Sequence, residues 1–264
     1  MTDIPPPPGA APPPPPPPNL TPPPGYAAYA PSYMSSVALK RVQGLTTWIV
    51  VLAAIVGAVG VGSTLLTLLA RDEASDFLAG RITDDDFVEA YSPALLLGFV
   101  QVPAMIALVV LTMIWMHRLA SNHRALHRDG TWSPGWAIGG WFLPPLVLYV
   151  IPYLMFRELW KASDPSVPAG DDRWKTNPVS IVVTLWWLAY GVAPIPIAIA
   201  QGREGITGNL NGDMESLAET VDERLAWSFA SSLIVALAAV LYIVLARQLS
   251  RRHRQLTGES AQSA

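Results

Sequence analysis

Residues Thr47 to Ala70 read TWIVVLAAIVGAVGVGSTLLTLLA and carry no charged side chain. As an α-helix this stretch rises about 36 Å, which is enough to cross the hydrocarbon core of a bilayer with some tilt. Trp48 stands near its start, where an interfacial indole ring is expected. The stretch therefore predicts a membrane-spanning helix.

Further apolar stretches extend this prediction to an all-α, multi-pass membrane protein. The mean hydropathy is +0.33, with 51% hydrophobic and 14% charged residues, which is too apolar for an ordinary soluble domain. Residues 136–156 are also uncharged, but Pro144, Pro145 and Pro152 interrupt them. This segment is a re-entrant hairpin turning near Pro144 and Pro145, an interfacial segment or a fifth span. The four spans expected without it are 47–70, 93–116, 178–200 and 226–246.

The distribution of Lys and Arg predicts the orientation of these spans, because basic residues near helix ends resist translocation. With four crossings, the side facing away from the cytoplasm holds only Arg71, Arg81, Arg203 and Arg224, together with two acidic segments. With five crossings the basic residues divide more evenly. Four crossings with both termini in the cytoplasm are therefore expected.

The two ends of the chain differ in composition from the middle. Residues 1–38 contain the proline runs Pro5 to Pro8 and Pro12 to Pro18, which are typical of an extended, disordered tail. Such a tail acts as a spacer or as a ligand for aromatic grooves of other proteins. The expected organisation is this tail, a helical membrane domain over 39–254 and a disordered tail over 255–264.

Composition also excludes several kinds of chemistry. The absence of cysteine rules out disulfides, thiol nucleophiles and cysteine-ligated metals. No Asp, Glu, Lys, Arg or His lies in the four expected spans, which counts against a proton-coupled carrier or an intramembrane protease. The sequence predicts no catalytic residue, no cofactor and no nucleic-acid partner.

Small residues recur at helical spacing in the first and last expected spans. Such residues let helix backbones approach closely in lipid. We expect the two stripes to meet, within one chain or between two copies in a homo-oligomer. They consist of Ala54, Ala58 and Gly62 in the first span and Ser228, Ser232 and Ala236 in the last.

His123 and His127 form the weak metal-binding candidate of this sequence. On a helix, residues four apart share a face, and this spacing lets two imidazoles hold one metal ion. No carboxylate stands between them, so a polar interfacial helix is the alternative reading. Basic residues and tryptophans gather around this region, and because they adjoin membrane helices they indicate contact with lipid headgroups.

One block of the sequence carries a family resemblance. The run GWAIGGWFLP from Gly135 to Pro144, followed by FRELWKASDP from Phe156 to Pro165, resembles the bacterial membrane family called domain of unknown function 4328. The resemblance implies several apolar helices joined to a Pro-rich tail, and it implies no activity. The polar tips of the second run predict a docking surface for a cytoplasmic partner or an anionic lipid headgroup: Arg157, Trp160, Lys161, Ser163 and Asp164.

These observations favour a binding, scaffold or regulatory component of the bacterial inner membrane. Its expected partners are membrane lipids and a cytoplasmic protein, which would contact the Pro-rich tail or residues 157–165. A small transporter or channel component is the first alternative, with a polar path from Gln101, Thr184, Ser228, Ser232 and the carbonyls near Pro194 and Pro196. A lipid-headgroup enzyme using His123, His127 and Asp164 is the second.

Overall fold

The computed structural model describes residues 38–142, 145–196, 214–223 and 225–259. The chain divides into two units, 1–38 and 39–264. The predicted Pro-rich tail lies outside the described residues except for Ala38, and so do residues 260–264 of the predicted C-terminal tail. All that follows concerns the second unit.

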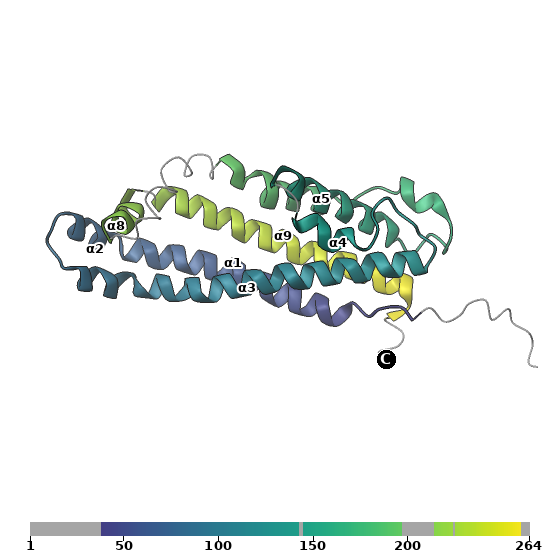
Figure 1. Ribbon diagram of the computed structural model, residues 1–264, viewed down its shortest axis with the longest axis horizontal. Coiled ribbons are helices and arrows are strands. Elements are labelled where there is room, and N and C mark those ends of the chain that lie inside the picture. The colour runs from purple at the N-terminus through teal and green to yellow at the C-terminus, as the bar shows by residue number, and fades with distance from the viewer. Residues whose placement is uncertain (1–37, 143–144, 197–213, 224, 260–264) are drawn as a thin grey trace, which may run out of the picture. The chain divides into compact units, whose positions relative to one another are not determined.

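Long apolar helices confirm the all-helical fold class, and the described ranges contain no β-strand. Helices α1 (Gln43–Leu69), α3 (Asp84–Ala125) and α9 (Leu225–Thr257) are each long and apolar enough to cross a membrane. They contain most of the predicted spans 47–70, 93–116 and 226–246. Helix α1 packs along both α3 and α9, and the three lie side by side in Figure 1.

Helix α3 shows how the sequence sets the ends of these helices. The Thr83 side chain accepts from the backbone N–H of Asp86, while the Asp86 carboxylate accepts from the backbone N–H of Thr83, forming a capping box. Asp84 and Asp85 complete an acidic first turn that complements the helix dipole. With 42 residues the helix rises about 63 Å, roughly twice the hydrocarbon thickness, so its charged ends extend beyond any bilayer it crosses.

The third predicted span, 178–200, is only partly described. Helix α6 (Ile181–Trp187) continues into a π-helical turn, η3 (Leu188–Val192), and the helical backbone reaches Pro196. The backbone N–H of Ala193 donates to the carbonyl of Leu188 at 2.8 Å, just before the first of the two prolines. The described part, 181–196, is apolar but shorter than a span, so a fourth crossing stays a prediction.

The proline-interrupted segment 136–156 is built from short pieces followed by one longer helix. Its elements are α4 (Trp136–Gly139), η1 (Gly140–Phe142) and α5 (Pro145–Ala162). Gly140 packs against α5 so closely that a Cβ there would lie 2.9 Å from Cγ2 of Ile151. The short helical segment before Pro144 therefore contacts α5. Whether residues 136–156 re-enter, lie along or cross a membrane stays a prediction. The second run of the family-like block begins in α5 and ends just after it, and η2 (Asp172–Thr176) follows.

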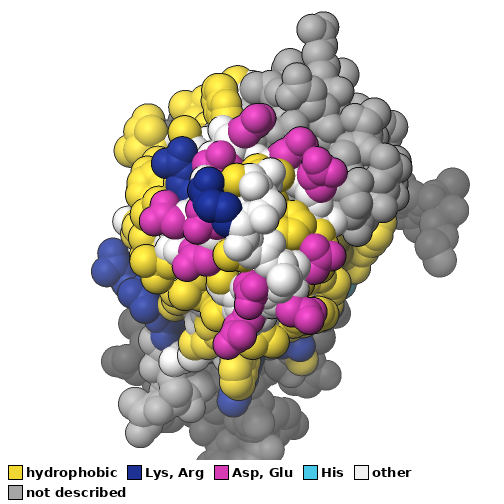
Figure 2. Space-filling model, turned by 90° about the vertical axis from the view of Figure 1, so that its left-hand side faces the viewer, with side chains coloured by type: hydrophobic (Ala, Val, Ile, Leu, Met, Phe, Trp, Pro, Cys, Tyr) yellow, Lys and Arg dark blue, Asp and Glu magenta, His cyan; other side chains and the backbone are white. Residues whose placement is uncertain are grey.

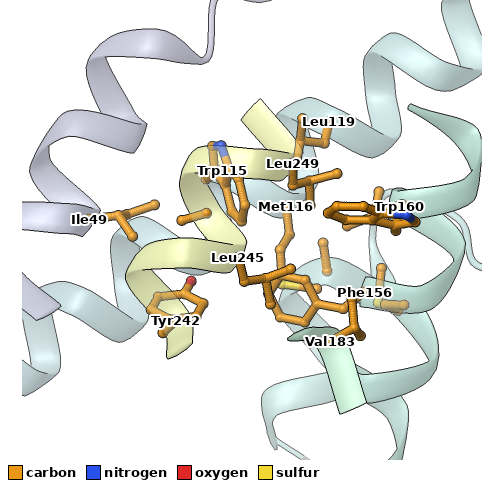
Figure 3. Close-up of a cluster of buried hydrophobic side chains, with 14 of the residues drawn as sticks. Ile49, Trp115, Met116, Leu119, Phe156, Trp160, Val183, Tyr242, Leu245 and Leu249 are labelled. Carbon is orange, nitrogen blue, oxygen red and sulfur yellow. The ribbon is translucent and has the colours of Figure 1, made fainter. Parts of the chain in front are cut away.

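Aromatic side chains form the main hydrophobic core at one end of the long helices. Trp115 of α3, Phe156 of α5 and Tyr242 of α9 are buried together, with Leu245 and Leu249 of α9 beside them (Figure 3). The rings of Phe156 and Trp186 meet edge to face at 4.9 Å between centroids. This core joins α5 and α6 to the three long helices.

Acidic side chains collect at the opposite end. The short helices α2 (Arg71–Leu78) and α8 (Met214–Glu223) pack together there, and Phe87, in the first turn of α3, is buried against both of them. Figure 2 shows Asp and Glu side chains clustered on this face. The described parts of the two segments predicted to share one side of the membrane thus lie at the same end of the helices, hereafter the acidic end. The basic end is the one formed by the start of α1 and the last turns of α3 and α9.

The contact between α1 and α9 uses a different face of α1 from the predicted stripe. A Cβ at Gly57 would lie 3.1 Å from Cβ of Ala239, so the backbones meet at this glycine. Ala54 and Ala58 are exposed, and Gly62 faces Leu97 of α3. On α9, Ala236 lies beside Gly57, Ser232 is buried and Ser228 is half-buried. Contact between two copies through the exposed alanines stays a prediction.

The helical domain continues past its predicted end at residue 254. Helix α9 extends to Thr257, and the Glu259 carboxylate accepts hydrogen bonds from the backbone N–H groups of Val42 and Gln43 at 3.2 to 3.3 Å. These N–H groups begin α1 and have no partner within the helix. A carboxylate at a helix N-terminus also complements the dipole, which gives residues 255–259 an ordered role that composition did not reveal.

Candidate functional site

Ser163, from the family-like block, sits at the centre of a buried polar network at the basic end. Its side chain is 0% exposed. The Oγ atom of Ser163 lies 3.0 Å from Nε2 of His123 on α3 and 3.5 Å from Nδ1 of His253 on α9. The two imidazole rings meet edge to face at 5.1 Å between centroids. One hydroxyl therefore links the end of α5 to both neighbouring long helices.

The hydrogen bonds of Asn122 fix the direction of this network. The amide oxygen of Asn122 accepts from the backbone N–H of Lys40 at 2.8 Å, and the amide nitrogen donates to the Lys40 carbonyl at 2.8 Å and to Nε2 of His253 at 2.9 Å. Because Nε2 of His253 accepts, its proton sits on Nδ1, which donates to Ser163. The Ser163 hydroxyl in turn donates to Nε2 of His123. The chain of donors holds only if both histidines are neutral.

Burial keeps both histidines neutral. They lie beyond the apolar stretches 93–116 and 226–246, at the charged ends of α3 and α9. Burial, together with the nearby charge of Arg128, lowers the pKa of His253 to about 3. Burial, followed by His253 and Arg128, also holds the pKa of His123 well below its usual value. The buried site therefore disfavours protonation of either imidazole.

Asp164, the residue after Ser163, forms a second link to α9. Its carboxylate accepts from the guanidinium of Arg252 at 2.9 Å, from the backbone N–H and hydroxyl of Ser166 and from the amide of Asn177. Burial raises the pKa of Asp164, but the hydrogen bonds from Ser166 and the charge of Arg252 outweigh it, so the net pKa is lowered. The Arg252 guanidinium also lies 4.9 Å from the centre of the Trp160 ring.

Arg128 closes the network from the side of α3. Its guanidinium, in a side chain only 1% exposed, donates to the carbonyls of Ala162, Asp164 and Val167. These carbonyls follow the end of α5 and have no helical partner. A buried arginine here therefore fixes the loop after α5 to the loop after α3.

The turn that sends Arg128 inward corrects the prediction for the two histidines. Helix α3 ends at Ala125, and His127 adopts a left-handed conformation with φ 54°. The N–H of Arg128 donates to the carbonyl of His123 and that of His127 to the carbonyl of Arg124, which together form a Schellman motif. His123 is buried and His127 is exposed, so the premise of a shared helix face is wrong. The described residues contain no group of three His, Asp or Glu side chains arranged to hold a metal ion.

The predicted docking residues separate into two sets. Trp160, Ser163 and Asp164 face the interior network, whereas Arg157 and Lys161 line an open hollow of about 430 Å³. We call this the α5 hollow. Its other walls come from the loop after α3, from α5 itself and from η2, through Gly130, Thr131, Trp132, Leu154, Glu158, Trp174 and Lys175.

Charges of both signs line the α5 hollow. The Lys161 ammonium donates to the backbone carbonyl of Lys175 at 2.9 Å, and the Lys175 ammonium lies 2.8 Å from the carboxylate of Asp172. The carboxylate of Glu158 accepts from the backbone N–H groups of Thr131 and Trp132 at 2.8 and 3.1 Å. These contacts hold the walls in place. The lining side chains give the hollow a net positive charge, because three cations stand against one carboxylate.

The described residues of the predicted transporter path lie on separate helices, Gln101 on α3, Thr184 on α6 and Ser232 on α9. The Thr184 hydroxyl lies 3.3 Å from the hydroxyl of Tyr153, and the Ser232 hydroxyl donates to the carbonyl of Phe229. Gln101 stands beside Gly60, and its Oε1 atom is buried with no hydrogen-bond partner among the described residues. A path through these residues stays a prediction.

The comparisons with known proteins bear on this same region. A family model described as Domain of unknown function (DUF4328) matches residues 82–251, which is more than half of the chain. The chain belongs to the DUF4328 family. The resemblance carried by residues 135–165 is thereby confirmed. The DUF4328 match includes His123, Arg128, Ser163 and Asp164, whereas α1 lies outside it and His253 follows it. The comparisons with curated proteins and with solved structures gave no match.

Three residues of the buried polar network were missed from sequence, Asn122, Arg252 and His253, and Arg128 was counted only among the basic residues expected to contact lipid headgroups. A signal for one of them was present in α9. Tyr242, Leu245, Leu249 and His253 recur at helical spacing and form one buried face that runs from the apolar stretch into the basic end. A histidine that continues an apolar face is a candidate for burial even when its neighbours in sequence are arginines.

Proposed function

We propose that this DUF4328 protein is a membrane-embedded scaffold that presents the α5 hollow to an acidic segment of a cytoplasmic protein. The observation that carries the proposal is the division of one short block into two faces. Trp160, Ser163 and Asp164 are committed to the interior, whereas Arg157 and Lys161 face the hollow. A fixed interior with a charged exterior is the arrangement of a docking platform.

The interior residues support the proposal because their hydrogen bonds restrict the motion of the segments that line the hollow. Arg128, Ser163 and Asp164 join the end of α5 to α3 and α9 through hydrogen bonds of buried or half-buried groups. A preformed surface loses less conformational entropy when a partner binds. The partner then meets a hollow that is already shaped.

The composition of the hollow favours a protein over a lipid headgroup. Two tryptophans, Trp132 and Trp174, line it, and tryptophan is enriched where partner side chains are anchored. Glu158 and Asp172 offset part of the positive charge of Arg157, Lys161 and Lys175. Cations, one lining carboxylate and aromatic walls together suit a peptide segment with acidic residues.

The proposal includes four membrane crossings with the basic end in the cytoplasm. The separation of acidic and basic residues to opposite ends of α1, α3 and α9 supports this orientation. It would place the α5 hollow where a cytoplasmic protein has access to it.

Photocrosslinking in living cells tests the proposal. A photoreactive amino acid replaces exposed Thr131 at the hollow, and the matched position is exposed Phe99 on the apolar part of α3. We expect one recurrent protein adduct from position 131, with the crosslinked peptide rich in Asp or Glu, and no such adduct from position 99. Charge reversal by R157E/K161E should reduce the adduct at least tenfold.

The control reverses the same number of charges elsewhere at the basic end, at exposed Arg41 and at Arg118, through R41E/R118E. This control variant should keep the adduct. Lipid adducts alone at position 131, or equal loss of the protein adduct in both charge-reversal variants, would refute the docking proposal.

A further inference from the structure

A second hollow, of about 420 Å³, lies between the start of α1 and the end of α9. Arginines from α9 line one side, through Arg247, Arg251 and Arg254, and the polar side chains of Gln43 and Thr47 line the other. We call this the α1–α9 hollow. It shares no lining residue with the α5 hollow.

Helical spacing explains why these arginines gather. Positions 247, 251 and 254 are separated by four and three residues, so their side chains share one face of α9. Arg252 lies off this face and turns to Asp164 instead. At the end of α9, Arg252 therefore contacts the interior network, whereas Arg247, Arg251 and Arg254 line the hollow.

The three arginines have no acidic partner within the described ranges of the chain. No ion pair joins any of them to an Asp or Glu there, and no carboxylate lines the hollow. The Nε atom of Arg254 is buried and has no hydrogen-bond partner among the described atoms. Glu259, an acidic residue that follows the end of α9, directs its carboxylate to the first N–H groups of α1. The three guanidinium groups are therefore suited to bind an anion.

The register of the two helices places the hollow at the edge of the apolar region. Thr46 and Ser250 meet with their hydroxyl oxygens 2.6 Å apart, and Gly57 meets Ala239 deeper along the same antiparallel pair. Arg247 is therefore level with the stretch from Ile49 to Val51. Val50 and Val51 line the deep end of the hollow, and Arg254 lines its polar end. This change from apolar to cationic lining matches a lipid, with an acyl chain beside the valines and its phosphate beside the arginines.

The spread of the arginines indicates more than one phosphate group. Arg247 and Arg254 are about 10 Å apart along the helix axis, by the rise of 1.5 Å per residue. A single phosphate at one of them would leave the other without a counterion. We propose that the α1–α9 hollow binds the headgroup of a phospholipid that carries two phosphate groups.

Lipid retention by the purified full-length protein tests this inference. The protein is reconstituted in phosphatidylcholine vesicles that contain either diphosphatidylglycerol, with two phosphates, or phosphatidylglycerol, with one, at equal total lipid charge. After extraction, native mass spectrometry counts the lipid that stays bound. We expect retention of diphosphatidylglycerol to exceed that of phosphatidylglycerol at least tenfold.

Two variants that remove equal charge separate a site from general attraction. R247Q/R251Q/R254Q should lose roughly tenfold or more of the bound diphosphatidylglycerol, because each cation contributes favourably beside anionic lipid. R157Q/K161Q/K175Q removes three charges from the α5 hollow and should retain the lipid. The charge-keeping variant R247K/R251K/R254K should retain most of it, which shows that the three positions tolerate substitution.

Three results would overturn the inference. Equal loss in both glutamine variants would mean diffuse electrostatic attraction, and equal retention of the two lipids would mean that one phosphate suffices. Complete displacement of the lipid by soluble inorganic pyrophosphate would mean that the hollow binds free phosphate groups and has no need of the acyl chain. None of these outcomes touches the protein adduct expected at the α5 hollow, so the two proposals fail separately.

Discussion

The carboxylate of Asp164 accepts a hydrogen bond at 2.9 Å from the guanidinium of Arg252, a residue 88 positions away along the chain. Both side chains are largely buried, at 18% and 27% exposure. Because loss of one partner of such a pair leaves the other charge poorly solvated, this contact is expected to matter for stability more than any surface ion pair of the described residues.

Replacing Asp164 by Asn should destabilise the protein by about 1 to 3 kcal/mol, since Arg252 loses its charged acceptor. The midpoint of thermal unfolding in detergent measures the effect. Asp172→Asn is the matched control, because the Asp172 and Lys175 side chains are 74% and 47% exposed and their pair should contribute at most about 1 kcal/mol. A shift as large for Asp172→Asn as for Asp164→Asn would contradict the assignment.

Acidification should destabilise the basic end through its buried histidines. In the unfolded chain a histidine takes up a proton near pH 6.5, whereas the pKa of folded His253 is lowered to about 3. The unfolded state therefore binds more protons between these values. The contribution of the neutral histidines to the free energy of unfolding is fully present above about pH 6.5. It falls as the pH drops below that value, by up to about 1.4 kcal/mol per pH unit for each buried histidine.

Unfolding midpoints at pH 7.5 and pH 5 measure this dependence. His253→Gln should lower stability at pH 7.5 but reduce the loss between the two pH values. His127→Gln, at an exposed position, should leave that loss as large as in the unmodified protein. Identical midpoints at both pH values in the unmodified protein would show that the histidines are not held neutral.

A larger side chain at Gly57 should separate α1 from α9. Because a Cβ there already lies 3.1 Å from Cβ of Ala239, Gly57→Ile should cost about 1 to 3 kcal/mol through overpacking. Gly98→Ile is the control within an apolar helix, since nothing lies within 4 Å of a Cβ at that position. Thermal unfolding of the two variants compares them, and equal midpoints would mean that the backbones do not meet at Gly57.

The absence of native cysteine makes the orientation directly measurable. Single cysteines at Asp85 and Glu215, both at the acidic end, should react with a membrane-impermeant maleimide in intact cells. A cysteine at Ser166, at the basic end, should react only after permeabilisation. Labelling of Ser166→Cys in intact cells, or protection of Asp85→Cys, would reverse the proposed orientation.

The sequence by itself determined the class of fold and the family. Uncharged stretches as long as a bilayer is thick predicted α1, α3 and α9. These features are local, because hydrogen bonds within one helix and the transfer of apolar side chains from water act along a continuous segment. The block from Gly135 to Pro165 likewise named the DUF4328 family without any contact being known.

The tertiary structure alone decided which polar residues are interior and which are exposed. Ser163 meets His123 and His253 because α3, α5 and α9 converge at the basic end. Arg251 and Arg252 are adjacent in sequence, but Arg251 lines the α1–α9 hollow and Arg252 contacts the half-buried carboxylate of Asp164. Spacing along one helix fixes the angle between two side chains, but it does not say which neighbouring helix lies at that angle. That choice depends on packing between distant segments, for which one sequence carries no local signal.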